Sequence, residues 1–123
     1  MSKPFALIVE DDAMLADIFL RALQAIEYET EIMRDGRVAS EWLQKNVPEL
    51  LVLDLHLPFL TGDDILNQVN VDTRFAATKI MIVTADALRA SYLNGNITLT
   101  LIKPVDVSQL QKLAHRLKPK PTT

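Results

Sequence analysis

Four short, unbroken apolar runs constrain the fold of this chain more than any other feature. Each run has four or five residues and lacks the apolar–polar alternation of a strand that is wetted on one face. Such runs are typical of strands buried on both faces, as in a parallel sheet covered by helices. The runs are 5–9, 50–53, 80–83 and 99–102, and residues 30–33 form a weaker fifth candidate.

Helical periods separate these runs. Apolar residues recur at spacings of three and four, which is the pattern of an amphipathic helix. The predicted helices cover 14–26, 38–43, 63–71, 86–93 and 107–117, of which 86–93 is the least regular. Asp106 is expected to cap the last helix. A β-α order repeated five times predicts an α/β fold with an open, doubly wound, five-stranded parallel sheet flanked by helices.

Composition excludes several kinds of site. The chain has 123 residues and no cysteine, which rules out disulfides, thiol catalysis and cysteine-bound metals. With only His56 and His115, a multi-histidine metal centre is also excluded. The apolar runs are far shorter than the roughly 20 residues that span a bilayer. No signal peptide is recognisable, so we expect a cytoplasmic protein that does not bind membranes.

Charge is distributed unevenly along the chain. Residues 1–64 hold 13 of the 16 acids and 5 of the 13 Lys and Arg residues, whereas residues 65–123 hold 3 acids and 8 bases. A nucleic-acid-binding domain would normally be basic overall, and this chain has a net charge of −3, so we expect no nucleic-acid binding. The acids of the first half suggest a cation site instead.

Polar residues close most of the apolar runs. In an open parallel sheet, ligands bind beyond the carboxyl ends of the strands. Carboxylates gathered there would repel one another unless a positive group lay among them, and Mg²⁺ prefers such oxygen ligands. The residues in question are Glu10, Asp11 and Asp12 after the first strand, Asp54 after the third, Thr84 after the fourth, and Lys103-Pro104 after the fifth.

Other interpretations of these residues remain open. Asp12 alone is equally well explained as a helix N-cap, Thr84 as a cap of the fourth helix, and Lys103 as a surface charge. A nucleotide or flavin phosphate is disfavoured as the ligand, because it binds to backbone N–H donors after the first strand, and this chain has acids there. An aspartyl-phosphate phosphatase would need a second acid two residues after Asp54, and that position is His56.

The motifs resemble those of response-regulator receiver domains, the phosphoacceptor modules of two-component signalling. They are Val9-Glu-Asp-Asp12, Leu53-Asp-Leu-His-Leu-Pro58, Gly62, Thr84-Ala85 and Lys103-Pro104, and they occur in the family's order. The resemblance extends from Phe5 to about Leu117. We therefore expect a receiver domain at 1–117 and a tail or the start of a linker at 118–123.

The resemblance implies roles for the residues around the phosphoryl group. Asp54 would be the phosphoacceptor, taking the group from a histidine kinase or a phosphotransfer protein. Lys103, the hydroxyl of Thr84 and the backbone of Ala85 would bind the phosphoryl oxygens. The domain would catalyse only its own phosphorylation and dephosphorylation, and its output partner would be an effector protein.

The resemblance also implies an Mg²⁺ cofactor. Asp12 would bind the metal directly and Asp11 largely through water. Asp54 and the backbone carbonyl of His56 would complete the ligands that the protein provides. The Lys103–Pro104 peptide bond would be cis.

Two departures from the family pattern bear on signalling. Thr100 stands where the family usually has an aromatic residue, three positions before the lysine. The stretch from Thr84 to Lys103 is also shorter than is common, which predicts a short or irregular fourth helix. Both favour an alternative, a receiver-like interaction module that phosphorylation does not regulate.

Overall fold

The apolar runs form one parallel sheet in the computed structural model of the chain, which describes residues 2–120. The strand order is β2-β1-β3-β4-β5, and each neighbouring pair is parallel. This confirms the predicted α/β sheet, and every strand end lies within one residue of its expected position. The strands are β1 (Phe5–Val9), β2 (Glu29–Met33), β3 (Leu50–Asp54), β4 (Lys79–Thr84) and β5 (Leu99–Ile102).

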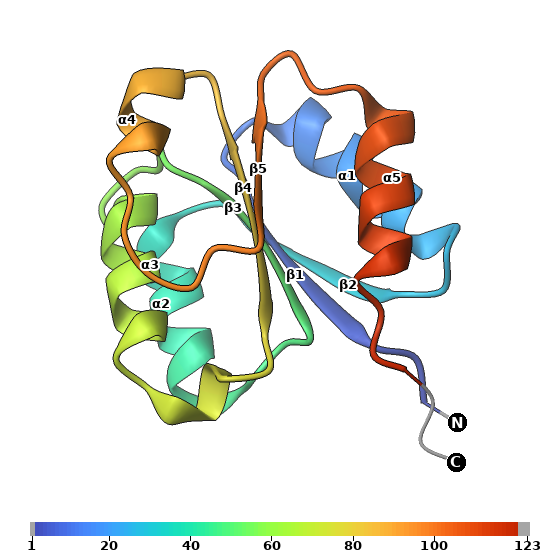
Figure 1. Cartoon of the computed structure of the whole chain (residues 1–123), viewed down its shortest axis with the longest axis horizontal. Helices are drawn as coiled ribbons and strands as arrows, with labels where there is room; N and C mark the ends of the chain where they lie inside the picture. Colours follow the sequence, from blue (N-terminus) through green and yellow to red (C-terminus); the bar gives the residue numbers. More distant parts are fainter. Residues whose placement is uncertain (1, 121–123) are drawn as a thin grey trace.

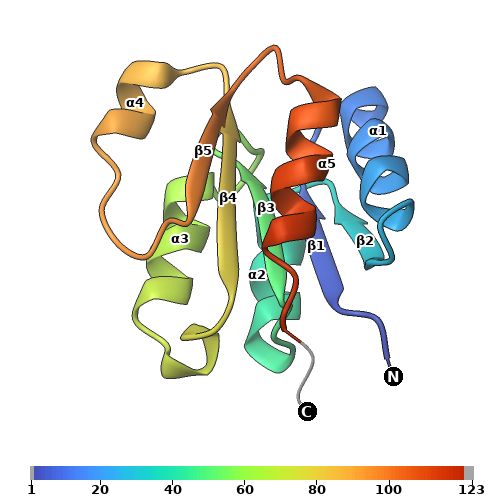
Figure 2. The ribbon, with the colours of Figure 1, turned by 45° about the vertical axis from the view of Figure 1, so that its right-hand side comes forward.

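Helices cover both faces of the sheet (Figures 1 and 2). Helices α2, α3 and α4 lie on one face, and α1 and α5 lie on the other. The predicted fourth helix is short, with five residues. A 3-10 turn, η1 (Thr73–Phe75), was not predicted, because three residues are too few to show a period. The helices are α1 (Ala13–Gln24), α2 (Gly36–Lys45), α3 (Gly62–Asn70), α4 (Ala87–Ser91) and α5 (Val107–Arg116).

The longer helices begin at side chains that accept a hydrogen bond from the first turn. Such caps satisfy backbone N–H groups that have no partner within the helix. Asp106 caps α5 by accepting from the backbone N–H of Gln109, as predicted. The other caps are Asp12 for α1, Asp35 for α2 and Thr61 for α3.

The strands separate two apolar cores. Successive side chains of a strand point to opposite faces, so each strand contributes to both cores. Leu51 and Leu53 of β3 pack with residues of α2 and α3, whereas Leu50 and Val52 pack with residues of α1 and α5. This double burial is the physical reason for the unbroken apolar runs.

Within residues 2–120, no helix combines the length and apolar character needed to cross a membrane. Lys118 to Lys120 follow α5, while positions 121–123 of the predicted tail, and residue 1 of the predicted domain, lie outside the described residues.

Gly62 allows α3 to begin against the end of β3. Its N–H donates to the carbonyl of Leu55 at 2.9 Å. A Cβ at this position would lie 2.6 Å from the Cα of Leu55 and closer still to the carbonyl oxygen of Asp54. Both obstacles are backbone atoms, so the chain could not relieve the clash by a change of rotamer.

We expect Gly62→Ala to destabilise the chain, although alanine is the better helix former. Forcing a methyl group into closed backbone costs about 1–3 kcal/mol. Urea denaturation followed by circular dichroism measures the change in free energy of unfolding. Asn67→Ala, an exposed change in the same helix, is the control. Equal stability of Gly62→Ala and the native chain would show that the backbone there has room.

Candidate functional site: an acidic pocket at the carboxyl ends of the strands

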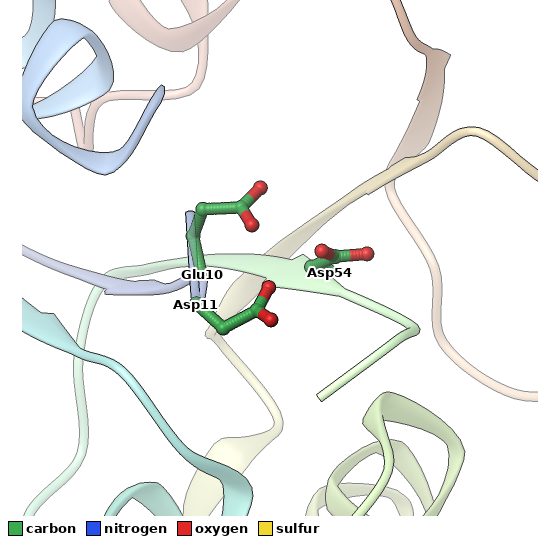
Figure 3. Close-up of side chains that lie close together, drawn as sticks. All are labelled: Glu10, Asp11 and Asp54. Atoms are coloured by element: carbon green, nitrogen blue, oxygen red, sulfur yellow. The ribbon is translucent and has the colours of Figure 1, made fainter. Parts of the chain in front are cut away.

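Three carboxylates meet where β1 and β3 end (Figure 3). Glu10 and Asp11 directly follow β1, and Asp54 is the last residue of β3. Val9 pairs with Leu53 in the parallel register, so the residues after them are neighbours. Each of the three side chains has an oxygen within 4.8 Å of the others. The predicted convergence of acids at this edge is therefore found, with Glu10 among them.

Lys103 supplies a positive charge to this pocket. Its Nζ lies 2.9 Å from Oε1 of Glu10 and 3.1 Å from Oδ2 of Asp54. The Glu10 and Asp54 side chains are only 2% and 4% exposed, and that of Lys103 is 22% exposed. The Lys103–Pro104 peptide bond is cis, as the resemblance implies. Two buried carboxylates thus share one ammonium group.

The alternation of side chains along the strands explains why these three groups meet. Glu10 continues the phase of Ile8, Asp54 that of Val52, and Lys103 that of Leu101. These three apolar residues all face α1 and α5. The side chains that follow them in phase leave the sheet on that same side.

Burial and neighbouring charge shift the pKa values in the pocket. The pKa of Glu10 is raised to about 7, chiefly by burial; Lys103 acts in the opposite direction, and the charge of Asp54 contributes to the increase. Burial alone would lower the pKa of Lys103, but hydrogen bonds to Glu10 and Asp54 outweigh it, so the net shift is upward. The ammonium therefore remains charged at neutral pH.

Asp12 lies outside this cluster. Its Oδ1 accepts a hydrogen bond from the N–H of Leu15 at 3.1 Å, so it is the N-cap of α1, and it is exposed. The chain turns into the helix directly after Asp11 and carries the Asp12 carboxylate away. The expectation that Asp12 is the direct metal ligand is therefore at odds with this geometry, and the open alternative of a helix cap describes what is found.

Glu10 was expected at this edge of the sheet but was assigned no role in the metal or phosphoryl site. The signal that could have identified it is its phase, since it follows Ile8 by two positions on the side where Asp54 and Lys103 lie. Its Oε2 also accepts from the N–H of Asp12 at 3.2 Å. Glu10 thus links the pocket to the first turn of α1.

His56, on the loop after β3, and Thr84, at the end of β4, flank Asp54. The N–H of His56 donates to Oδ1 of Asp54 at 3.1 Å. Thr84 is fully buried at the end of β4, and its Oγ1 accepts from the N–H of Asp86 at 3.1 Å. Ala85, the next residue, is exposed. The structure thus places the expected His56, Thr84 and Ala85 beside the pocket.

Arg34 holds the loop that carries Asp11 and was not expected to take part. Its Nε and Nη2 donate to the carbonyl oxygen of Asp11 at 3.2 and 3.0 Å. This fork fixes the backbone between β1 and α1 and brings a second positive charge close to the acids. A single arginine after an edge strand carries no sequence signal of this kind.

The donor set of the pocket suits a hard divalent cation. Carboxylate and carbonyl oxygens are the ligands that Mg²⁺ takes, usually together with water. One ammonium contacts two of the three carboxylates but neutralises a single unit of charge, so the cluster keeps a net negative charge for a cation to meet. Among the described residues, Glu10, Asp11 and Asp54 form the group that could hold a metal ion.

Comparison with known proteins gives consistent results. Residues 6–115 match the family described as "Response regulator receiver domain". The chain is 30% identical over 118 residues to the sensor histidine kinase TmoS of Ectopseudomonas mendocina, covering 94% of this chain but only 12% of TmoS.

Solved structures show the same fold. The signal receiver domain of a LuxO repressor protein from Vibrio parahaemolyticus has a TM-score of 0.83 at 25% identity, covering 94% of this chain and 89% of that one. The receiver domain of the sensor histidine kinase PA1611 from Pseudomonas aeruginosa, solved with magnesium coordinated in its active-site cleft, has a TM-score of 0.82 at 22% identity, covering 94% of this chain and 98% of that one.

The pKa of Glu10 predicts how stability depends on pH in the absence of metal. Because the pKa is raised in the native state to about 7, the native state binds a proton more tightly than the unfolded state. The free energy of unfolding should therefore fall as pH rises from about 4.5 to 7. Lys103 does not titrate in this window, since its pKa is shifted upward.

In chelator, we expect Glu10→Gln to melt at a higher temperature than the native chain at pH 8 and at nearly the same temperature at pH 5. The difference at pH 8 should be on the order of 1–3 kcal/mol. Differential scanning calorimetry at the two pH values measures it. Glu41→Gln, at an exposed position, is the matched control. A gain of equal size at both pH values would contradict the raised pKa.

Proposed function

Because the chain belongs to the family of response regulator receiver domains, we propose that it is a phosphoacceptor switch in which Asp54 takes a phosphoryl group from a phosphohistidine. The observation that carries the proposal is the pairing of the buried Asp54 carboxylate with Lys103 at 3.1 Å, at the carboxyl edge of the sheet. The donor would be a histidine kinase or a phosphotransfer protein. The kinship with the sensor histidine kinase TmoS supports this choice of partner.

The proposed chemistry is phosphoryl transfer by positioning and charge neutralisation. An oxygen of Asp54 attacks phosphorus, and the bond from phosphorus to the histidine nitrogen breaks with its electron pair on nitrogen. Lys103 meets the charge on the transferred oxygens. The hydroxyl of Thr84, once it turns toward Asp54, and the N–H of Ala85 would bind these oxygens.

The proposed cofactor is Mg²⁺, held by Asp11, Asp54 and the carbonyl of His56, with Glu10 next to them. When bound, the ion neutralises charge on the phosphoryl oxygens. The magnesium in the cleft of the PA1611 receiver domain supports this choice. We place Asp12 outside the ligand set, because its carboxylate caps α1. The product stays on Asp54, so the chain would catalyse only its own phosphorylation and dephosphorylation.

A second candidate is a receiver-like module that binds partners without regulated phosphorylation. Two observations favour it: α4 has five residues, and Thr100 is exposed in β5 where the family usually has an aromatic side chain. Both concern the output of the domain. The pairing of Asp54 with Lys103 concerns its chemistry, and for that reason we prefer the phosphoacceptor. In either case the downstream partner would be an effector protein.

We expect the chain to take one phosphoryl group from phosphoramidate in the presence of Mg²⁺, because its P–N bond resembles that of phosphohistidine. Intact-mass measurement detects the product. Asp54→Asn should abolish it, and so should excess chelator. Asp64→Asn, an exposed acid of α3, is the control and should behave like the native chain. An increment that survives Asp54→Asn would overturn the assignment of the acceptor, and no increment in the native chain would favour the second candidate.

We expect Asp11→Asn to remove most of the stabilisation by Mg²⁺ and Asp12→Asn to retain it, since asparagine also caps helices. In the native chain, Mg²⁺ at ten times its Kd should add about 1.4 kcal/mol to the free energy of unfolding. Thermal denaturation is the suitable measurement. Trp42 fluorescence is not, because its ring stacks on Phe5 at the opposite end of β1, with the centroids 5.3 Å apart. If Asp12→Asn removed the stabilisation by Mg²⁺ and Asp11→Asn kept it, Asp12 would be the metal ligand.

A further inference from the structure

A bridge of four side chains joins α4 to the loop that follows β3. Nη2 of Arg89 lies 2.8 Å from Oδ1 of Asp63, and its Nε lies 3.4 Å from Oδ2 of the same carboxylate. The guanidinium thus grips the first turn of α3 with two nitrogens. Its remaining Nη1 lies 3.4 Å from Nδ1 of His56. We call Arg89, Asp63, His56 and Asp86 the Arg89 bridge.

The imidazole of His56 is held between two residues of the α4 region. A guanidinium has only donors, so Arg89 donates and Nδ1 of His56 accepts. The other ring nitrogen, Nε2, lies 3.9 Å from Oδ2 of Asp86. Asp86 is also the N-cap of α4, accepting from the N–H of Arg89 at 2.9 Å. The ring thus contacts Arg89 of α4 through Nδ1, while its other side faces the Asp86 carboxylate beyond hydrogen-bond distance.

Little else holds the beginning of α4 in place. The helix has five residues, far fewer than an isolated helix needs in water, and all of their side chains are half-buried or exposed. Ala90 and Leu93 pack against the core on this face of the sheet. Leu88 and Tyr92 are 68% and 74% exposed. The position of this segment thus depends heavily on the ion pair of Arg89 with Asp63.

The Arg89 bridge connects the two loops that flank Asp54. On one loop, the N–H of His56 donates to Oδ1 of Asp54 at 3.1 Å. On the other, Thr84 accepts from the N–H of Asp86, the cap of α4. The bridge lies across the ends of both loops, so while it is intact the loops are held together beside the carboxylate.

We propose that Arg89 is a positioning residue whose bridge to Asp63 and His56 keeps the loop between β4 and α4 closed beside Asp54 and so prolongs the life of a phosphoryl group there. This inference rests on the proposed function. The phosphoryl group is lost by hydrolysis. A water oxygen attacks phosphorus, and the bond from phosphorus to Asp54 breaks with its electron pair returning to the carboxylate. Inorganic phosphate leaves with the protons of the water. Arg89 touches none of these atoms and acts by limiting the approach of water.

Three variants test the bridge. Arg89→Ala removes it, and Arg89→Lys keeps the charge but not the fork of two nitrogens. Asp63→Asn keeps an acceptor but not the charge. Arg74→Ala is the matched control, because Arg74 also forms an exposed fork to an aspartate, Asp72, but on η1 and not beside the pocket.

Two measurements are made on each variant. Hydrogen exchange of residues 85–93 in the unphosphorylated chain reports how firmly the loop and α4 are held. We expect exchange about three to five times faster in Arg89→Ala and Asp63→Asn, which is the size that the loss of one surface ion pair allows, and a smaller change in Arg89→Lys. The rate of phosphoryl loss from Asp54, followed by intact mass after removal of phosphoramidate, should rise several-fold in the same order.

A charge reversal provides the rescue. Arg89→Asp combined with Asp63→Arg should recover slow exchange and slow loss, whereas either change alone should not. Unchanged exchange in Arg89→Ala would overturn the bridge, and faster exchange with an unchanged rate of loss would overturn its role in phosphoryl lifetime. If the native chain takes no phosphoryl group, the proposed function fails and the lifetime claim falls with it, while exchange still decides whether Arg89 holds the loop.

Discussion

The ammonium group of Lys103 is the interaction on which the arrangement of the pocket depends. Carboxylates as buried as those of Glu10 and Asp54 would be costly without a charged partner. Lys103 extends from the far edge of the sheet, and β4 lies between its strand and β3. Two strand spacings are roughly 10 Å, a gap that a long, unbranched side chain can help to close. The residue that directly follows β5 thereby connects the carboxyl ends of β1 and β3, and the third acid, Asp11, adds negative charge that favours a cation.

The segment between β4 and β5 is held largely by polar side-chain contacts. A longer helix would bury an apolar face there, but α4 ends at Ser91 and the chain then runs along α3 before entering β5 (Figure 1). Polar side chains of α3 and of the loop before it replace part of the missing packing. Near α4 they belong to the Arg89 bridge. At the other end, Asn70 accepts from the N–H of Asn96 at 3.1 Å and donates to the carbonyl of Asn94 at 3.3 Å. Such contacts exchange with water more readily than an apolar interface does.

The fold was predictable from the sequence because the central strands β1, β3 and β4 are buried on both faces and appear as apolar runs, whereas the edge strand β2, with Glu29 and Glu31 exposed, has a weaker pattern. Convergence of acids was predictable for the same reason, since parallel strands end at one edge. Which of the acids enter the pocket was not predictable, because three acids follow β1 in a row and either Glu10 and Asp11 or Asp11 and Asp12 could have entered it. Asp12 differs from Asp11 only in that the chain turns into α1 there and directs its carboxylate to the helix. Glu10 lies in the pocket because it continues the strand phase of Ile8. Contacts of Arg34 and Arg89 depend on loops whose course no local pattern encodes.

The sheet itself acts as a partition between two tasks. Glu10, Asp54 and Lys103 continue strand phases that face α1 and α5, whereas Thr84 continues the phase of Ile80 and Ile82, which face the opposite layer. The two buried carboxylates and the ammonium thus lie on one side of the sheet, whereas Asp11 and the hydroxyl of Thr84 continue phases that face the other side. Substitutions in the layer of α1 and α5 should therefore alter the charge pairing of the pocket directly, and those in the layer of α3 and α4 should act on it only through the loops beside Asp54. Because the two sets of side chains belong to opposite layers, each set can change in evolution without repacking the other.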